Sequence, residues 1–99
     1  MTYKDYIAEM IEHSQSVLLA KYDEYATEDH FHNFNVASVL QGQTPEQALI
    51  GMMDKHVVSV HDLVNKQATG EEISFDTWRE KIGDNINYLL ILWAMVNMK

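Results

Sequence analysis

The sequence predicts an all-α protein, a single domain over residues 1–99 that folds as a four-helix bundle. Three observations predict this class. Apolar residues recur at spacings of three and four in four successive stretches, as they do along one side of an α-helix. No stretch has the alternation that is typical of a β-strand. The connections are short and carry helix-capping residues, and short connections favour antiparallel neighbours.

The first helix is expected to begin just after Thr2. Thr2 is a suitable N-cap, and Asp5 places a negative charge near the helix start, where it is favourable. Helical spacing then continues for about six turns. The predicted inward stripe consists of Ile7, Met10, Ile11, Ser14, Val17, Leu18, Tyr22 and Tyr25. Small and polar residues at 26–30 predict a loop.

A short second helix is predicted from Phe31 to Gln41. Gly42 follows it directly, at the position where a glycine commonly ends a helix. The side chains expected to point inward are Phe31, Phe34, Ala37 or Ser38, and Leu40.

The start of the third helix has the clearest local pattern in the chain. Thr44 can cap it, Pro45 suits the first helical position, and Gln47 is placed to complete a capping box. The predicted apolar stripe of this helix is formed by Leu49, Met53, Val57, Val60 and Val64. Gly70 is expected to end the helix after Thr69.

The fourth helix is expected to be capped by Ser74, Asp76 or Thr77. Its stripe of Trp78, Ile82, Ile86, Leu89, Trp93 and Val96 is expected to face a core. From residue 88 to residue 96 the helix is apolar all round, which is typical of a helix buried on every side. Three other helices in a chain of 99 residues do not cover it fully. We therefore expect a homo-oligomer, most simply a dimer with two-fold symmetry.

Charge restricts the choice of partners. Fifteen acidic residues stand against seven basic ones, giving a formal charge of −8, which repels the phosphates of DNA and RNA. Nucleic-acid binding is therefore not expected. The same balance suits a protein that reaches phosphates through divalent cations, or one that docks on a basic protein. With 46% hydrophobic residues, the chain is nevertheless expected to fold.

The chain contains no cysteine, which excludes disulfides and thiolate metal sites. Its longest apolar run is less than half of the roughly 20 residues that span a bilayer, and no leader peptide is recognisable. We expect a soluble cytoplasmic protein that does not enter a membrane.

Acidic residues near the start of the fourth helix are candidate metal ligands. Glu80 and Asp84 are one turn apart, so both can bind one Mg²⁺ or Mn²⁺ ion through carboxylate oxygens. Asp54, on the flank of the third helix, could supply a third oxygen.

A purely structural alternative explains the same residues without a metal. Thr77 and Glu80 would form a capping box, and Asp84 would pair with Lys81 or Lys55 at the surface. The five histidines are scattered along the chain and do not favour a zinc site.

The segment EKIGDNINYLLIL, residues 80–92, resembles the last metal-binding helix of the MazG-like all-α nucleoside triphosphate pyrophosphohydrolases. In that family, acidic residues precede an Asp that is followed four residues later by Tyr. Asp84 and Tyr88 match this pair, and Glu80 matches the acid one turn earlier. Three further segments are similar to small, often phage-encoded relatives: KYDEY at 21–25, HNF at 32–34 and MMDKH at 52–56.

The resemblance implies a protein that binds Mg²⁺ or Mn²⁺ through Asp54, Glu80 and Asp84 and positions a nucleoside triphosphate. Glu80 and Asp84 would be the catalytic residues. The metal would polarise the phosphate and help generate the attacking water, releasing pyrophosphate and a monophosphate. Expected nucleotide-binding residues are Lys21, Asn33, Phe34, Lys55, Asn87 and Tyr88.

The sequence also departs from the family pattern. The usual Glu-x-x-Glu pair is missing, because Gly51 and Val57 flank Asp54 at those offsets, and Lys81 replaces an acid of the last motif. At most three of the four usual carboxylates remain. A second hypothesis is therefore a non-catalytic phage accessory protein in the host cytoplasm. It would sequester a nucleotide or dock on a basic host protein through its acidic surface.

Overall fold

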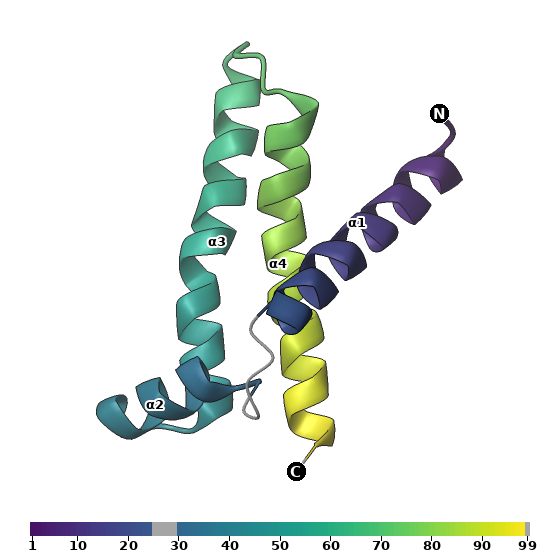
Figure 1. Ribbon diagram of the computed structural model, residues 1–99. Coiled ribbons are helices and arrows are strands. Elements are labelled where there is room, and N and C mark those ends of the chain that lie inside the picture. Colours follow the sequence, from purple (N-terminus) through teal and green to yellow (C-terminus); the bar gives the residue numbers. More distant parts are fainter. Residues whose placement is uncertain (25–29, 99) are drawn as a thin grey trace.

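The computed structural model describes residues 1–24 and 30–98, with side chains described for 1–21 and 30–98. This part of the chain folds into helices only, which confirms the all-α class, and the helices pack on one another (Figure 1). The four helices are α1 (Tyr3–Glu24), α2 (His32–Gln41), α3 (Pro45–Ala68) and α4 (Phe75–Asn97). The predicted loop at 26–30 lies outside the described residues except for His30, and so do the side chains of Tyr22 and Tyr25.

The predicted helix ends are confirmed by their hydrogen bonds. At the start of α3 the Thr44 hydroxyl accepts from the Gln47 amide at 3.1 Å, and the Gln47 side chain accepts from the Thr44 amide at 2.9 Å. Ser74 caps α4 by accepting from the amide of Thr77. Gly42 ends α2 with φ of 64°, a left-handed conformation that glycine adopts without steric cost.

The helices form an open arrangement. Helices α3 and α4 make an antiparallel pair, α1 crosses α4, and α2 packs on the first turns of α3 (Figure 1). Among the described residues, α1 approaches no helix other than α4 closely. The radius of gyration is 15.5 Å, whereas a compact chain of this length has about 13 Å.

The core of one chain is small. Phe34, Leu49 and Met95 form its buried centre, and partly buried residues such as Met52 and Tyr88 pack around them. In α2, Phe34 and Ser38 are buried as predicted. Leu40 was predicted to point inward, but it is 80% exposed, because α2 contacts α3 through its opposite side.

The prediction that the apolar stripe of α4 faces the core of the chain is wrong for four of its six members. Ile82, Leu89, Trp93 and Val96 are 37% to 69% exposed. The buried residues of α4 are instead Gly83, Asn87 and Met95. The reason is that α1 and α3 contact other sides of α4. The same correction applies in part to the other predicted stripes, where Ile7, Ile11, Val57 and Val64 are exposed.

None of the helices in the described ranges has the length and apolar character needed to cross a membrane.

Candidate functional site

A hollow of about 300 Å³ lies between α1 and α4. It is lined by His13, Val17, Asp76, Arg79, Glu80, Gly83, Asp84 and Asn87. We call it the α1/α4 hollow. Three of the residues that the sequence singled out, Glu80, Asp84 and Asn87, line it together.

Gly83 lets the two helices approach closely enough to form this hollow. A Cβ atom at this position would lie 3.2 Å from the Met10 Cε atom and 3.7 Å from both the His13 Cδ2 and the Ser14 Oγ atoms. Glycine in a helix interior costs about 1 kcal/mol relative to alanine. The close packing of α1 against Gly83 is a physical reason for its presence.

Arg79 connects the rim of the α1/α4 hollow to α1. Its Nη1 atom donates to the Glu9 carboxylate at 3.0 Å, and its Nη2 atom donates to the Asp76 carboxylate at 3.3 Å. The guanidinium carbon also lies 5.5 Å from the centre of the Phe75 ring, within range of a cation–π interaction. The hollow therefore has one fixed positive group among its acidic residues.

Two buried polar atoms at the contact between α1 and α4 have no hydrogen-bond partner in the described structure. They are the Ser14 Oγ atom and the Asn87 Oδ1 atom, and the residues are 1% and 9% exposed. A buried polar group without a partner costs about 1–3 kcal/mol. Because a carboxamide oxygen can only accept, Asn87 requires a donor or a cation.

Asp84 lies between the α1/α4 hollow and α3. Its Oδ2 atom is 3.6 Å from the His56 Nδ1 atom, so the two attract as charges when His56 is protonated. The Tyr88 ring packs on the His56 ring at 4.9 Å and meets Phe34 edge-on at 6.2 Å. Burial raises the pKa of the Tyr88 hydroxyl above its ordinary value of 10.0, and the charge of Asp84 raises this pKa further.

The structural alternative for the acids is not what the described residues form. Asp84 pairs with His56 and makes no ion pair with Lys81 or Lys55 there. The cap of α4 is Ser74, one turn before the Thr77 of the alternative capping box.

The three predicted metal ligands are only partly brought together. Glu80 and Asp84 share the α1/α4 hollow, whereas Asp54 is exposed on α3 and does not line it. Within residues 1–24 and 30–98, no group of three or more His, Asp or Glu side chains is placed to hold a metal ion. One chain therefore does not gather this trio, and the Mg²⁺ or Mn²⁺ site stays a prediction.

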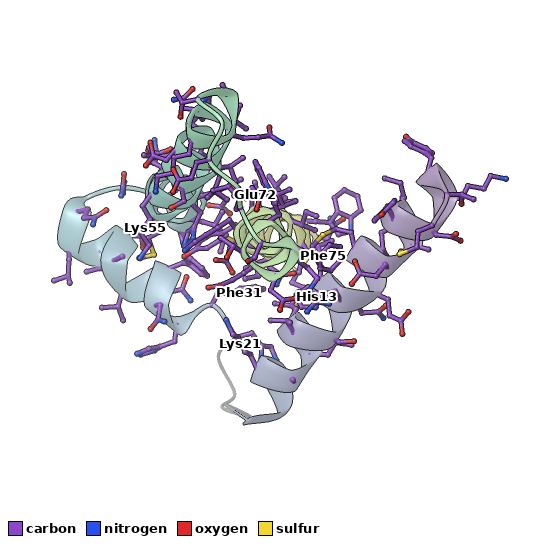
Figure 2. The ribbon with its side chains drawn as sticks, turned by 90° about the horizontal axis from the view of Figure 1, so that it is seen from above. His13, Lys21, Phe31, Lys55, Glu72 and Phe75 are labelled. Carbon is purple, nitrogen blue, oxygen red and sulfur yellow. The ribbon has the colours of Figure 1, made fainter. Side chains whose placement is uncertain are left out.

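The predicted nucleotide-binding residues are dispersed. Lys21 and Asn33 are exposed on α1 and α2, and Lys55 is exposed on α3. In Figure 2, Lys55 lies on the α2 side of the molecule and His13 on the α1 side. Phe34 is a core residue packed against Tyr88, so its ring is not free to stack on a base.

Sequence reasoning did not assign His13 and Arg79 to the site, and it did not identify Ser14, predicted to point inward, as a residue of the contact between α1 and α4. Their positions on amphipathic helices look like ordinary surface or core positions. Gly83 was the available signal, because an isolated glycine in a strongly helical segment indicates close packing of a second element. This signal identifies the contact between two helices, but it does not identify the partner helix.

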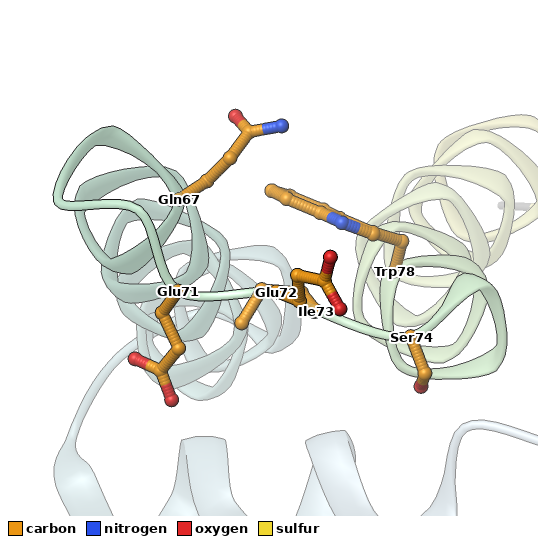
Figure 3. Close-up of a pocket in the computed structure, with 6 residues that line it drawn as sticks. All are labelled: Gln67, Glu71, Glu72, Ile73, Ser74 and Trp78. Carbon is orange, nitrogen blue, oxygen red and sulfur yellow. The ribbon is translucent and has the colours of Figure 1, made fainter.

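A second hollow, of about 570 Å³, lies at the turn between α3 and α4. Figure 3 shows the Trp78 ring extending from α4 towards Gln67, with the Glu72 carboxylate beside it. It contains none of the predicted site residues, and the Gln67 and Glu72 residues are exposed. We therefore base the functional argument on the α1/α4 hollow.

No family model, no curated protein and no solved structure matches the chain. The resemblance to MazG-like enzymes remains a prediction from the quoted residues alone.

Proposed function

We propose that the α1/α4 hollow binds a divalent cation, Mg²⁺ or Mn²⁺, and through it the phosphates of a nucleotide. One observation carries the proposal. The Asn87 Oδ1 atom is buried with no hydrogen-bond partner among the described residues, and Asn87 lines the same hollow as Glu80 and Asp84. A cation, or a water bound to it, would satisfy this oxygen.

The residue types and their spacing suit a hard cation. Glu80, Asp84 and Asn87 are separated by four and three positions, so their side chains project from one side of α4. Carboxylate and carboxamide oxygens are ligands for Mg²⁺, which keeps several waters and often binds through one or two carboxylates plus substrate phosphates. Two carboxylates are therefore enough for a site completed by a nucleotide.

Charge and size support a phosphate-bearing ligand. A chain with a formal charge of −8 repels free phosphate, and a bound cation reverses this repulsion locally. The hollow, at about 300 Å³, is at the small end of the range for ligand pockets. It can admit a cation and phosphate groups while the sugar and base lie outside. Arg79 lines the same hollow and offers a guanidinium to a phosphate oxygen.

Hydrolysis is the stronger form of the proposal, and the resemblance to MazG-like enzymes motivates it. A water activated by the cation would attack a phosphorus atom, the bond to the leaving pyrophosphate would break, and a nucleoside monophosphate would remain. Glu80 and Asp84 would act by holding the cation.

Calorimetric titration with MnCl₂ tests the cation site. We expect Asp84→Asn and Glu80→Gln each to weaken Mn²⁺ binding by about tenfold or more, because each removes a charged ligand. Asp54→Asn is the matched control and is expected to bind like the wild type, because Asp54 lies outside the hollow. Equal losses in all three variants would instead favour the trio predicted from the sequence.

Asn87→Leu tests the observation that carries the proposal. It removes the oxygen and fills a similar volume with apolar atoms. We expect it to weaken Mn²⁺ binding without lowering the stability of the metal-free chain, because no described residue forms a hydrogen bond with the buried oxygen that the substitution would remove. Wild-type Mn²⁺ affinity in this variant would contradict a role for Asn87.

The nucleotide is tested by titration in the presence of Mn²⁺ and by measuring pyrophosphate release from a panel of ribo- and deoxynucleoside triphosphates. Release that is absent in Asp84→Asn would support hydrolysis. No release above that control would remove the enzyme hypothesis. A chain that binds neither Mn²⁺ nor any nucleotide would contradict the whole proposal and favour docking on a basic protein.

We also propose that the chain forms the homodimer expected from its sequence.

A further inference from the structure

One side of the antiparallel α3/α4 pair is apolar and uncovered. It carries seven hydrophobic residues that are 37% to 69% exposed in one chain. They are Ile50, Val57 and Val64 of α3 and Ile82, Leu89, Trp93 and Val96 of α4. We call this set the outer face. The four members from α4 belong to the stripe predicted for that helix, and so do Val57 and Val64 for the stripe of α3.

The members from both helices lie on the same side of the pair. Ile50 and Val57 each follow by one position a residue that points into the fold, Leu49 and His56, and one position turns a side chain by about 100°. In α4, the Asn85 side chain donates to the backbone oxygen of His56, so position 85 faces α3. Ile86 follows it by one position, and Ile82 and Leu89 lie four and three positions from Ile86, on the same side of the helix. In two antiparallel helices that face each other, the residue one position after a facing residue points to the same side of the pair in both helices.

The two covering helices leave this side open. Helix α2 and the C-terminal half of α1 lie on the other side of the α3/α4 pair (Figures 1 and 2). Among the described residues, twenty large hydrophobic side chains are exposed, and only five hydrophobic residues are buried. A contiguous exposed apolar patch of several hundred Å² marks a surface that another molecule contacts.

We infer that the outer face docks on the outer face of a second copy of this chain. The spacing supports it, because Ile50, Val57 and Val64 are seven residues apart, as are Ile82, Leu89 and Val96. Seven-residue spacing builds the seam between packed helices. Two such helix pairs, packed with their outer faces together, would form an intermolecular four-helix bundle.

Area and charge favour a second copy as the occupant. The seven residues expose on the order of 700 Å², close to the roughly 800 Å² that each partner buries in a standard stable interface. None of them is charged, so docking two outer faces would bury no charged side chain of this set. Trp93, 69% exposed, is the large aromatic that commonly anchors an interface.

A second copy is also the one partner present wherever the chain folds. The buried core is small, so the outer face must be covered for the chain to be stable, and a two-fold contact uses the same surface twice. This inference does not rest on the cation site. The α1/α4 hollow is lined from other sides of α4, so either proposal can fail alone.

Light scattering at micromolar concentration gives the first test. We expect a mass of twice 11.5 kDa for the wild type. The double variant Leu89→Glu, Trp93→Glu is expected to lose this mass, as a monomer or as an unfolded chain, because four charges would be buried in the contact of two copies. A wild-type chain that is monomeric and folded would overturn the inference and leave the face to another protein.

The matched control is the double variant Val39→Glu, Leu40→Glu. Its two side chains are 82% and 80% exposed on α2, outside the outer face. We expect it to keep the wild-type mass. Loss of the dimer in this variant, with the dimer retained in Leu89→Glu, Trp93→Glu, would place the contact elsewhere and overturn the inference.

Cross-linking keeps the test decisive if the glutamate variant fails to fold. The chain has no cysteine, so a single Leu89→Cys or Val57→Cys substitution provides one thiol per copy. With a short bis-maleimide, we expect covalent dimers from both, and little from Val39→Cys at the same concentration. The reverse pattern would overturn the inference.

Discussion

Two sides of α4 contrast with each other. The side towards α1 is polar but closed, with Gly83 and Asn87 buried there. The outer face is apolar but open, with Leu89 and Trp93 more than half exposed. Each side is unfavourable in an isolated chain, because two buried polar atoms lack partners among the described residues and exposed apolar surface contacts water. This difference motivates the two separate proposals, a cation on the side towards α1 and a second copy of the chain on the outer face.

The largest expected effect is the loss of unfolding free energy on truncating a core residue, compared with truncating a residue of the outer face. Leu49 is fully buried, so Leu49→Ala should lower the free energy of unfolding by about 2–5 kcal/mol. Leu89→Ala should destabilise mainly by weakening the contact between copies. Urea denaturation at two concentrations about a hundredfold apart distinguishes them, because association makes stability depend on concentration.

In that experiment, the midpoint of the wild type should rise with concentration. The loss caused by Leu89→Ala should be seen chiefly in this concentration dependence. A wild-type midpoint that is the same at both concentrations would show that the outer face does not stabilise the chain through association.

The next effect concerns the close contact between α1 and α4. Gly83→Leu forces a bulky side chain against Met10 and should lower the free energy of unfolding by about 1–3 kcal/mol. Gly51→Ala is the control, since nothing lies within 4 Å of the added Cβ. It should raise stability by about 0.5–1 kcal/mol through helix propensity. Equal effects from the two variants would mean that α1 does not pack on Gly83.

A smaller effect compares two buried serines. The Ser38 hydroxyl donates to the Asn35 carbonyl at 2.7 Å, whereas the Ser14 hydroxyl has no partner among the described atoms. In the metal-free chain, Ser14→Ala should therefore be more stable than Ser38→Ala by about 1 kcal/mol. Thermal unfolding measures the difference. A Ser14→Ala variant that is the less stable of the two would indicate that the hydroxyl is already satisfied.

The smallest effect is the pH dependence contributed by Tyr88. Its raised pKa means that the folded chain keeps a proton which the unfolded chain loses near pH 10.0. Stability should therefore fall as the pH rises from the ordinary value of this pKa through the raised one. Tyr88→Phe should reduce this alkaline loss, measured by urea denaturation across the range. Tyr3→Phe, at a residue 82% exposed, is the control for removing a phenol. If Tyr88→Phe lost as much stability at alkaline pH as the wild type, Tyr88 would not be the source of the pH dependence.

The sequence was sufficient to predict the four helices and several of their ends. Local hydrogen bonds determine such ends, and Thr44, Gly42 and Ser74 carry the side chains or backbone freedom that these bonds need. The inward side of α4 could not be predicted in the same way. A stripe such as Leu89 and Trp93 indicates that a surface will be covered, but the periodicity is the same whether the cover comes from the same chain or from another copy.

The candidate site was predictable only in part. Glu80, Asp84 and Asn87 come from one helix, so their spacing was enough to place them together. Asp54 comes from another helix, and its distance from them depends on the rotation of α3, which spacing does not determine. His13 lines the hollow, and Ser14 approaches Gly83, because α1 crosses α4. This crossing is a tertiary feature that no local sequence pattern predicts.

The isolation of α1 has a consequence for how the protein moves. Because α1 approaches only α4 among the described residues and forms one wall of the hollow, its detachment and the departure of the proposed cation should be thermodynamically linked. Amide hydrogens of α1 would then exchange with deuterium faster than those of α3, and adding Mn²⁺ would slow the exchange in α1 selectively. Packing of α1 on α4 would therefore be more stable when the hollow holds a cation than when it is empty.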